Sequence, residues 1–181
     1  MKDLRNIINL QKGDITKLKV DAIVNAAKSS LLGGSGVDGA IHEAGGQSIL
    51  EECKEIICRQ SKCNVGQAVI TKAGVLPSNY VIHTVGPVWY GGKRNERNQL
   101  AECYRNSLRL AVENNCKTIA FPNISTGIYR FPKDEAAKIA VETVIKFIVA
   151  SDKIEKLIFI CFEDDNFNYI KEELISQIDL V

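Results

Sequence analysis

The sequence lacks an excess of charge of either sign. Its 181 residues include 23 Lys and Arg against 22 Asp and Glu, which gives a formal net charge of +1. Proteins that grip a nucleic acid backbone usually carry a basic excess or a basic stripe, and this chain has neither a basic nor an acidic block. Nucleic acid is therefore not an expected partner.

Long hydrophobic runs are also missing. The longest uninterrupted apolar run is Leu157–Phe162, far short of the roughly 20 residues that a membrane-spanning helix needs. The N-terminal residues form only a brief apolar patch, without the pattern of a secretory leader. We expect a cytoplasmic protein with no membrane partner. No linker, repeat or low-complexity tract divides the chain, so we expect one domain over residues 1–181.

The cysteines lack the spacing of a metal site. No two of them are separated by the two residues of a zinc knuckle. Two fall within helical or strand patterns, where a cysteine behaves as a small hydrophobic residue. We expect no metal, no cofactor and no disulfide framework. The six are Cys53, Cys58, Cys63, Cys103, Cys116 and Cys161.

Short apolar runs alternate with longer periodic stretches, which is typical of strands exchanging with helices. The pattern predicts strands at 7–10, 22–25, 67–71, 80–85, 118–121 and 157–162, and helices at 43–58, 94–114, 132–151 and 166–178. Central strands that are apolar on both faces need helices on both sides. The predicted fold class is therefore α/β, a three-layer α/β/α sandwich.

The connection after the second predicted strand is rich in glycine. Four of the seven residues from Gly33 to Gly39 are glycine, which a scaffold role alone explains poorly because glycine costs conformational entropy on folding. Such a loop brings backbone N–H groups against ligand oxygens. A helix that starts near Asp38 would add its N-terminus to a phosphate site.

Two well-known nucleotide motifs do not fit this connection. Residues 34–39 read G-S-G-V-D-G, a formal match to the dinucleotide fingerprint G-x-G-x-x-G. However, the glycines do not follow the strand in a tight turn, and no strand ends in an acidic residue about 20 positions later. A P-loop is excluded because no Gly-Lys-Ser/Thr closes the glycine run.

A second connection, residues 121–132, also suits an anionic ligand. Ser125, Thr126 and Gly127 offer N–H and O–H donors, and Tyr129 and Phe131 could flank a sugar or a base. Alone, this segment could equally be a plain surface turn. Two such connections at the carboxyl ends of strands in one sheet favour a ligand site, because that edge is where α/β folds bind ligands.

Together these segments resemble the macrodomain family, and within it the MacroD-like ADP-ribose-binding hydrolases. The likeness runs in collinear order from about residue 13 to residue 162. It implies a mixed, mostly parallel central sheet. The matching stretches are G-D-I-T (13–16), V-D-A-I-V-N-A-A (20–27), residues 31–42, G-Q-A (66–68), V-I-H-T-V-G-P-V-W (81–89) and S-T-G-I-Y (125–129).

The resemblance implies a binding role for the matching residues. Asp14 would accept a hydrogen bond from the adenine amino group beside the Ile15 backbone, and Phe162 would stack on the adenine. The distal ribose would lie near Asn25, Asp38 and Tyr129, with Lys28 in the same loop. Backbone N–H groups of two segments would hold the diphosphate: Gly34, Ser35, Gly36 and Val37 in the first, and Ser125, Thr126, Gly127, Ile128 and Tyr129 in the second.

The resemblance also implies a reaction, the hydrolytic release of ADP-ribose from O-acetyl-ADP-ribose or from acidic side chains of mono-ADP-ribosylated proteins. Asp38 is the residue we expect to activate or orient the attacking water, with a substrate phosphate as a candidate helper. The expected partners are ADP-ribose or O-acetyl-ADP-ribose and mono-ADP-ribosylated proteins. The implied mechanism requires no metal.

Each of these residues also has a purely structural interpretation. Asp14 could be only a turn or cap residue, Phe162 only a core residue, and Asp38 only a helix N-cap. We interpret His42 as a packing or hydrogen-bonding residue in preference to a catalyst, and His83 as structural.

The chain departs from the family pattern at two positions of the glycine-rich connection. Lys28 stands where the family usually has asparagine, and an ammonium can only donate hydrogen bonds where an amide also accepts. We hypothesise that Lys28 leaves ADP-ribose binding intact but lowers turnover, so a non-catalytic reader of ADP-ribose is the alternative function. Ser35 replaces a usual glycine, which matters only if its φ is positive. An RNA-binding module is unsupported, because no basic and aromatic residues alternate.

Overall fold

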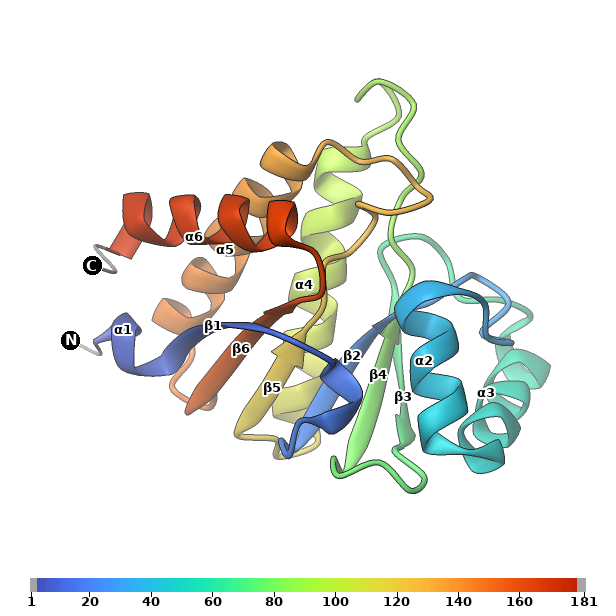
Figure 1. Ribbon diagram of the computed structural model, residues 1–181. Coiled ribbons are helices and arrows are strands. Elements are labelled where there is room, and N and C mark those ends of the chain that lie inside the picture. The colour runs from blue at the N-terminus through green and yellow to red at the C-terminus, as the bar shows by residue number, and fades with distance from the viewer. Residues whose placement is uncertain (1–2, 179–181) are drawn as a thin grey trace.

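Strands and helices alternate along the chain, as the apolar pattern predicts (Figure 1). The computed structural model describes residues 3–178, and the predicted single domain of 1–181 extends past them at both ends. The strands are β1 (Ile8–Lys12), β2 (Ala22–Ala26), β3 (Ala68–Lys72), β4 (Tyr80–Thr84), β5 (Thr118–Phe121) and β6 (Lys156–Cys161). The helices are α1 (Leu4–Ile7), α2 (Gly36–Gly45), α3 (Gln47–Gln60), α4 (Glu96–Glu113), α5 (Lys133–Ala150) and α6 (Asp164–Ile178), with a 3₁₀ turn, η1, at Ile15–Lys17.

The six strands form one mixed sheet in the order β1-β6-β5-β2-β4-β3. Neighbouring strands are parallel except β3 and β4, which pair antiparallel with Ala68 opposite Thr84. The short connection of residues 73–79 suffices for this hairpin, whereas each parallel pair needs a crossover. The mixed, mostly parallel sheet implied by the resemblance is confirmed.

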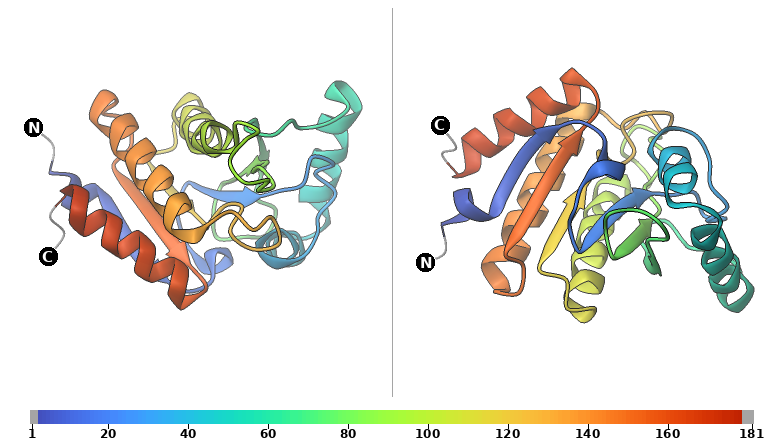
Figure 2. Two further views of the ribbon diagram at one scale, coloured as in Figure 1. Left: turned by 90° about the horizontal axis from the view of Figure 1, so that it is seen from above. Right: turned by 60° about the horizontal axis from the view of Figure 1, so that its bottom comes forward.

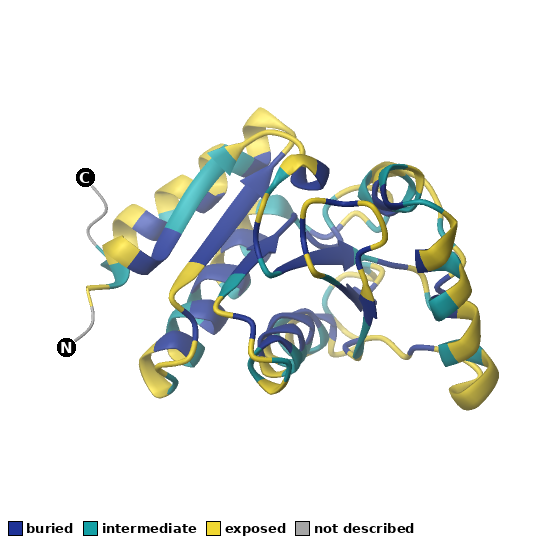
Figure 3. Ribbon diagram, turned by 90° about the horizontal axis from the view of Figure 1, so that it is seen from below, coloured by how far each residue is buried: buried dark blue, intermediate teal, exposed yellow. Residues whose placement is uncertain are grey.

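Helices cover both faces of the sheet. Leu157 and Phe159 of β6 point into a cluster with the apolar faces of α4, α5 and α6. Ile158 and Ile160, on the opposite face, join a second cluster with residues of α2 and α3. Figure 2 shows α4 and α2 on opposite sides of the strands, and Figure 3 shows the inner strands almost wholly buried. The predicted three-layer sandwich is therefore confirmed.

The prediction of a single helix over 43–58 is wrong, because the helical conformation is interrupted between α2 and α3. Gly46 has φ +83°, and its N–H bonds to the carbonyl of His42. A glycine in this left-handed conformation ends a helix. The apolar period continues across the break, so periodicity alone could not reveal it. The brief α1 and η1 were also not predicted, since three or four residues carry no periodic signal.

The five parallel strands all end at the same edge of the sheet, the upper edge in Figure 1. The connections that leave this edge include residues 27–35 after β2 and 122–132 after β5. The two loops that the sequence singles out for ligand binding are thus neighbours. No helix of residues 3–178 is both long enough and apolar enough to cross a membrane.

Candidate ADP-ribose site

A cavity of about 590 Å³ opens at this edge of the sheet, between the connections that follow β1, β2, β5 and β6. Its size is typical of pockets that take a small organic ligand. Asn25 and Gly34, which were expected to bind the ligand, do not line it. The other predicted site residues do: Asp14, Ile15, Lys28, Ser35, Gly36, Val37, Asp38, Ser125, Thr126, Gly127, Ile128, Tyr129 and Phe162.

Several lining residues were missed by the sequence reasoning. Most are small or apolar, and such residues give no chemical signal in a sequence. Gly86 has a clear structural role, because a Cβ there would lie 2.2 Å from Ser125 Oγ and 2.7 Å from Ile124 Cγ2. Its lack of a side chain lets the β5–α5 loop approach β4. The missed residues are Gly13, Ala26, Ala27, Ala40, Gly86, Pro122, Asn123, Ile124, Ile160, Glu163 and Asn166.

One end of the cavity carries Asp14 and Phe162. Asp14 caps η1, since its Oδ1 accepts hydrogen bonds from Thr16 N at 2.9 Å and Thr16 Oγ1 at 2.7 Å. These hydrogen bonds hold the pKa of Asp14 below its ordinary value. Both use Oδ1, so the cap is compatible with a second role for Oδ2. Phe162 is 83% exposed, so its interpretation as a core residue is wrong.

The glycine-rich connection leads directly into α2. Ser35 is the N-cap with φ −104°, so the strain considered for it does not arise. Positive φ falls instead on Leu31 (+57°), Gly33 (+83°) and Gly36 (+61°), and the two glycines adopt it without the steric cost of a Cβ. Residues 35–38 begin the helix and line the cavity. The first N–H groups of a helix have no partner within it, and they bear its positive dipole end.

The loop after β5 forms a compact turn on the other side. Its backbone bonds to itself, Arg130 N to Gly127 O at 3.0 Å and Phe131 N to Ser125 O at 2.9 Å. Phe131 does not flank a ligand as suggested, because it is only 2% exposed and its ring lies 4.6 Å from that of Trp89. Tyr129 is half-buried and does line the cavity.

The carboxylate of Asp38 lies at the inner end of the glycine-rich connection. It is 3% exposed, and its Oδ1 accepts a hydrogen bond from Asn25 Nδ2 at 2.7 Å. Its Oδ2 is buried without a hydrogen-bond partner among the described residues. The N-cap interpretation of Asp38 is wrong, since Ser35 holds that position. Asn25 is fully buried behind Asp38, so it acts on the cavity only through that carboxylate.

Comparison with known proteins agrees with this arrangement. The Macro domain family model matches residues 24–140, from β2 into α5. An O-acetyl-ADP-ribose deacetylase of Klebsiella pneumoniae is 57% identical over 164 residues, covering 91% of this chain and 94% of that protein. The chain belongs to the Macro domain family.

Solved macrodomain structures extend the similarity to the whole fold. A mutant of the Oceanobacillus iheyensis macrodomain with ADPR superposes with a TM-score of 0.93 at 39% identity, covering 99% of this chain and 97% of that one. The Trypanosoma brucei macrodomain in complex with ADP-ribose gives 0.84 at 38% identity, covering 91% and 68%.

In this macrodomain Lys28 is exposed at the cavity, close to Asp38. A Cβ placed on Gly34 would lie 3.0 Å from both Lys28 Nζ and Asp38 Oδ2. Lys28 Nζ and Asp38 Oδ2 are therefore no further apart than twice 3.0 Å, but the two side chains form no ion pair. Gly34 makes room for the lysine side chain beside the carboxylate.

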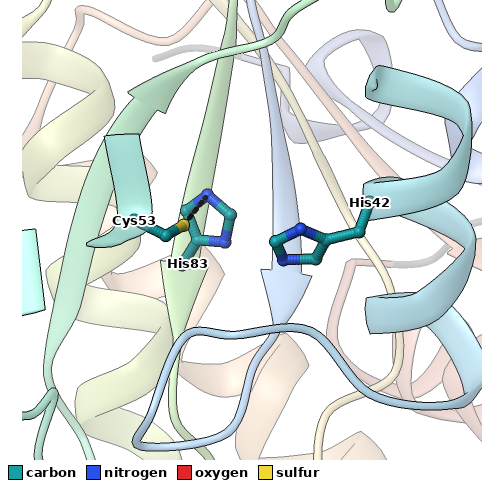
Figure 4. Close-up of side chains that lie close together, drawn as sticks. All are labelled: His42, Cys53 and His83. Atoms are coloured by element: carbon teal, nitrogen blue, oxygen red, sulfur yellow. Dashed lines mark hydrogen bonds between the residues drawn. The ribbon is translucent and has the colours of Figure 1, made fainter. Parts of the chain in front are cut away.

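Behind Asp38 the macrodomain has a cluster that sequence spacing did not indicate, made of the partly buried His42 and the buried Cys53 and His83 (Figure 4). They come from α2, α3 and β4. One imidazole nitrogen of each histidine and the sulfur of Cys53 lie within 4.8 Å of one another. Burial raises the pKa of the Cys53 thiol to about 12 and lowers the pKa of His83 to about 3, so both are neutral. His83 is fully buried, as a structural histidine should be.

His42 contacts Asp38 from within the same helix. Its Nε2 is 3.5 Å from Asp38 Oδ1 and forms no hydrogen bond with the described residues, while its ring packs under Gly33. Both nitrogens of His83, in contrast, lie at hydrogen-bonding distance from neighbours: Nδ1 is 3.1 Å from Asn25 Nδ2 and Nε2 is 3.0 Å from Thr71 Oγ1. His83 and Cys53, whose Sγ lies 3.8 Å from His83 Nε2, are thus part of a hydrogen-bonded layer behind the carboxylate.

Proposed function

We propose that this macrodomain binds ADP-ribose and hydrolyses ADP-ribose adducts, with Asp38 activating or orienting the attacking water. The observation that carries the proposal is the buried Asp38 carboxylate, which lines the cavity and keeps Oδ2 without a protein partner. The name of the Klebsiella pneumoniae relative and the two ligand-bound macrodomains support the same ligand class.

The lining residues suggest how the ligand would lie. The adenine would occupy the end with Asp14, Ile15 and Phe162, and the distal ribose the end with Asp38 and Tyr129. The diphosphate would lie between residues 35–37 and 125–129, which line the cavity. The first turn of α2 would then direct N–H groups at the phosphates, which needs no basic side chain.

The proposed chemistry at an ester of the distal ribose is ordinary hydrolysis. Asp38 accepts a proton from water as the water oxygen bonds to the acyl carbon. The bond between that carbon and the ribose oxygen then breaks, and the ribose oxygen takes up a proton. ADP-ribose and a carboxylic acid leave. We propose O-acetyl-ADP-ribose and ADP-ribosylated acidic side chains as the substrates, with no metal or cofactor taking part.

Three further features of the chain are also proposed: its domain organisation, its location and its macromolecular partners. We propose that residues 1–181 act as one domain and work in the cytoplasm, and that mono-ADP-ribosylated proteins are its macromolecular partners.

One observation favours the second candidate function, a reader that binds ADP-ribose with little turnover. Lys28 places a cation beside Asp38, where it competes with water for the carboxylate.

The test combines calorimetry with ADP-ribose and the release of label from O-acetyl-ADP-ribose and from a glutamate-modified protein. Asp38→Ala should lower turnover by about 10²- to 10⁴-fold, the usual contribution of a positioned proton acceptor, while ADP-ribose still binds. Asp134→Asn, at an exposed position of α5, is the matched control and should retain wild-type turnover. Binding without release by the wild type would make the protein a reader, and full turnover by Asp38→Ala would remove Asp38 from the mechanism.

A further inference from the structure

We propose that His83 and Thr71 are positioning residues that hold the Asn25 amide in one orientation and thereby place the Asp38 carboxylate. Neither residue lines the cavity. The inference rests on the proposed role of Asp38 in hydrolysis and extends it to residues two and three contacts away from Asp38.

The chain begins at Thr71, in β3. Its hydroxyl donates to the carbonyl oxygen of Lys72 at 2.9 Å. In the proposed arrangement this bond uses the one hydrogen of the hydroxyl, so Thr71 Oγ1 accepts from His83 Nε2, 3.0 Å away, with Cys53 Sγ 3.8 Å from the same nitrogen. The hydrogen of the neutral imidazole therefore resides on Nε2.

This tautomer determines what the other ring nitrogen does. With the hydrogen on Nε2, Nδ1 carries a lone pair and accepts from Asn25 Nδ2 at 3.1 Å. The second N–H of the same amide donates to Asp38 Oδ1 at 2.7 Å. Both N–H groups of the Asn25 amide are thus used. With this placement of the hydrogens, each contact from Lys72 to Asp38 pairs one donor with one acceptor.

The opposite orientation of the Asn25 amide is unfavourable at both ends. It would put the single carbonyl oxygen of Asn25 in the place of Nδ2, where it would face both the Asp38 carboxylate and the lone pair of His83 Nδ1. Asn25, His83 and Thr71 are all at most 2% exposed, so water cannot repair a mismatched contact. Protonation of His83 would also conflict, because Nδ1–H would face the donor of Asn25.

The sharpest test replaces Thr71 with residues of nearly the same shape. Thr71→Val removes the oxygen acceptor of His83 Nε2–H and leaves it the sulfur of Cys53, a weak acceptor 3.8 Å away, whereas Thr71→Ser keeps the hydroxyl. Thr84→Val is the matched control, since Thr84 is a buried threonine of the adjacent strand whose hydroxyl donates to Gln67 O, outside this chain of contacts. The readouts are the imidazole nitrogen signals of His83 and the side-chain amide signal of Asn25 in ¹⁵N NMR, calorimetry with ADP-ribose, and kcat and KM.

We expect the wild type, Thr71→Ser and Thr84→Val to show the Nε2–H tautomer and similar kinetics. Thr71→Val should shift His83 toward the Nδ1–H form, move the Asn25 amide signal and lower kcat by about 10- to 100-fold, because small displacements of a catalytic group are costly. KM and ADP-ribose affinity should change little, since the cavity wall is intact.

Three results would overturn the proposal. An Nδ1–H tautomer in the wild type would refute it even if no variant folds. An unmoved Asn25 signal in a folded Thr71→Val would show that the orientation does not depend on Thr71. A shifted tautomer with unchanged kcat would separate the hydrogen bonds from catalysis. If the wild type releases no ADP-ribose at all, the proposed function fails, and the two NMR readouts still decide the positioning role.

Discussion

Lys28 is the residue whose chemistry departs most from the binding pattern around it. It is an exposed cation in a site where we propose that backbone N–H groups bind the phosphates, and it stands beside the buried carboxylate. His83 presents the reverse case, a titratable ring held neutral by burial in a layer that no solvent reaches. These two side chains give the predictions that belong to single residues.

Replacing Lys28 by asparagine should raise turnover without changing ADP-ribose affinity. The ammonium attracts the Asp38 carboxylate and competes with the water for it. Lys28 is exposed and forms no ion pair with the buried Asp38, so we expect an effect no larger than the roughly 0.2–1 kcal/mol of an exposed charge pair, which is a gain in kcat of about 1.4- to 5-fold. Lys62→Asn, at another exposed lysine, is the control. Unchanged turnover in Lys28→Asn, measured in the label-release assay, would contradict the hypothesis.

Buried His83 should make the fold less stable in mild acid. Burial lowers its pKa in the folded state from 6.5 to about 3, so between these values the unfolded chain binds a proton that the folded chain does not. The free energy of unfolding should therefore be highest above pH 6.5 and fall as the pH decreases, with a slope of up to about 1.4 kcal/mol per pH unit from this residue.

Urea unfolding between pH 7 and 5 measures this slope, since most carboxylates titrate at lower pH. His83→Gln provides the comparison, because it removes the histidine and its proton. The slope of the variant should be shallower than that of the wild type. Equal slopes would show that burial does not lower the pKa of His83 in the folded state as described.

At the scale of elements, the site is built from the connections that leave the carboxyl edge of the sheet. β2 and β5 are neighbours in the sheet. In the sequence, however, 91 residues lie between Ala26, where β2 ends, and Thr118, where β5 starts. Their two loops meet only because the sheet places them side by side. Gly86, which follows β4, controls how closely the second loop can approach.

Gly86→Ala should weaken ADP-ribose binding by displacing the β5–α5 loop. The new Cβ would fall 2.2 Å from Ser125 Oγ and 2.7 Å from Ile124 Cγ2, so the loop must move. Calorimetry should show reduced affinity in a protein that still folds. Gly91→Ala is the control, because its Cβ would meet nothing within 4 Å and only its positive φ of +86° is strained. Equal affinities for the two variants would contradict this explanation.

At the scale of the whole molecule, a nearly neutral chain is proposed to bind a ligand with two phosphates. The formal charge of +1 does not count the N–H groups at the start of α2 or those of the loops. One sheet with two buried clusters supports both loops, so the stability of the core and the binding of ligand are separable properties.

Phe121→Ala should lower the free energy of unfolding by about 3–5 kcal/mol, the usual cost of such a cavity. Phe121 is fully buried, packs on the rings of Tyr104 and Phe159, and does not line the ligand cavity. Saturating ADP-ribose at 100 times its Kd should add about 2.7 kcal/mol to wild type and variant alike. Urea unfolding with and without ligand checks both values, and a smaller ligand increment in the variant would mean that core and site are coupled.

The sequence alone was sufficient to predict the strands and the helices α4, α5 and α6, and to single out two loops and Asp38 as candidates for a ligand site. These follow from local periodicity, from glycine density and from motifs in collinear order, none of which needs a long-range contact. Only the tertiary structure decided that Gly46 divides a helix, that Phe131 is buried and Phe162 exposed, and that Asn25 lies behind Asp38. Thr71, His83 and Asn25 come from three strands, and their hydrogen bonds depend on the sheet register that places those strands side by side. A sequence states which donors and acceptors exist, but the folded sheet decides which of them meet.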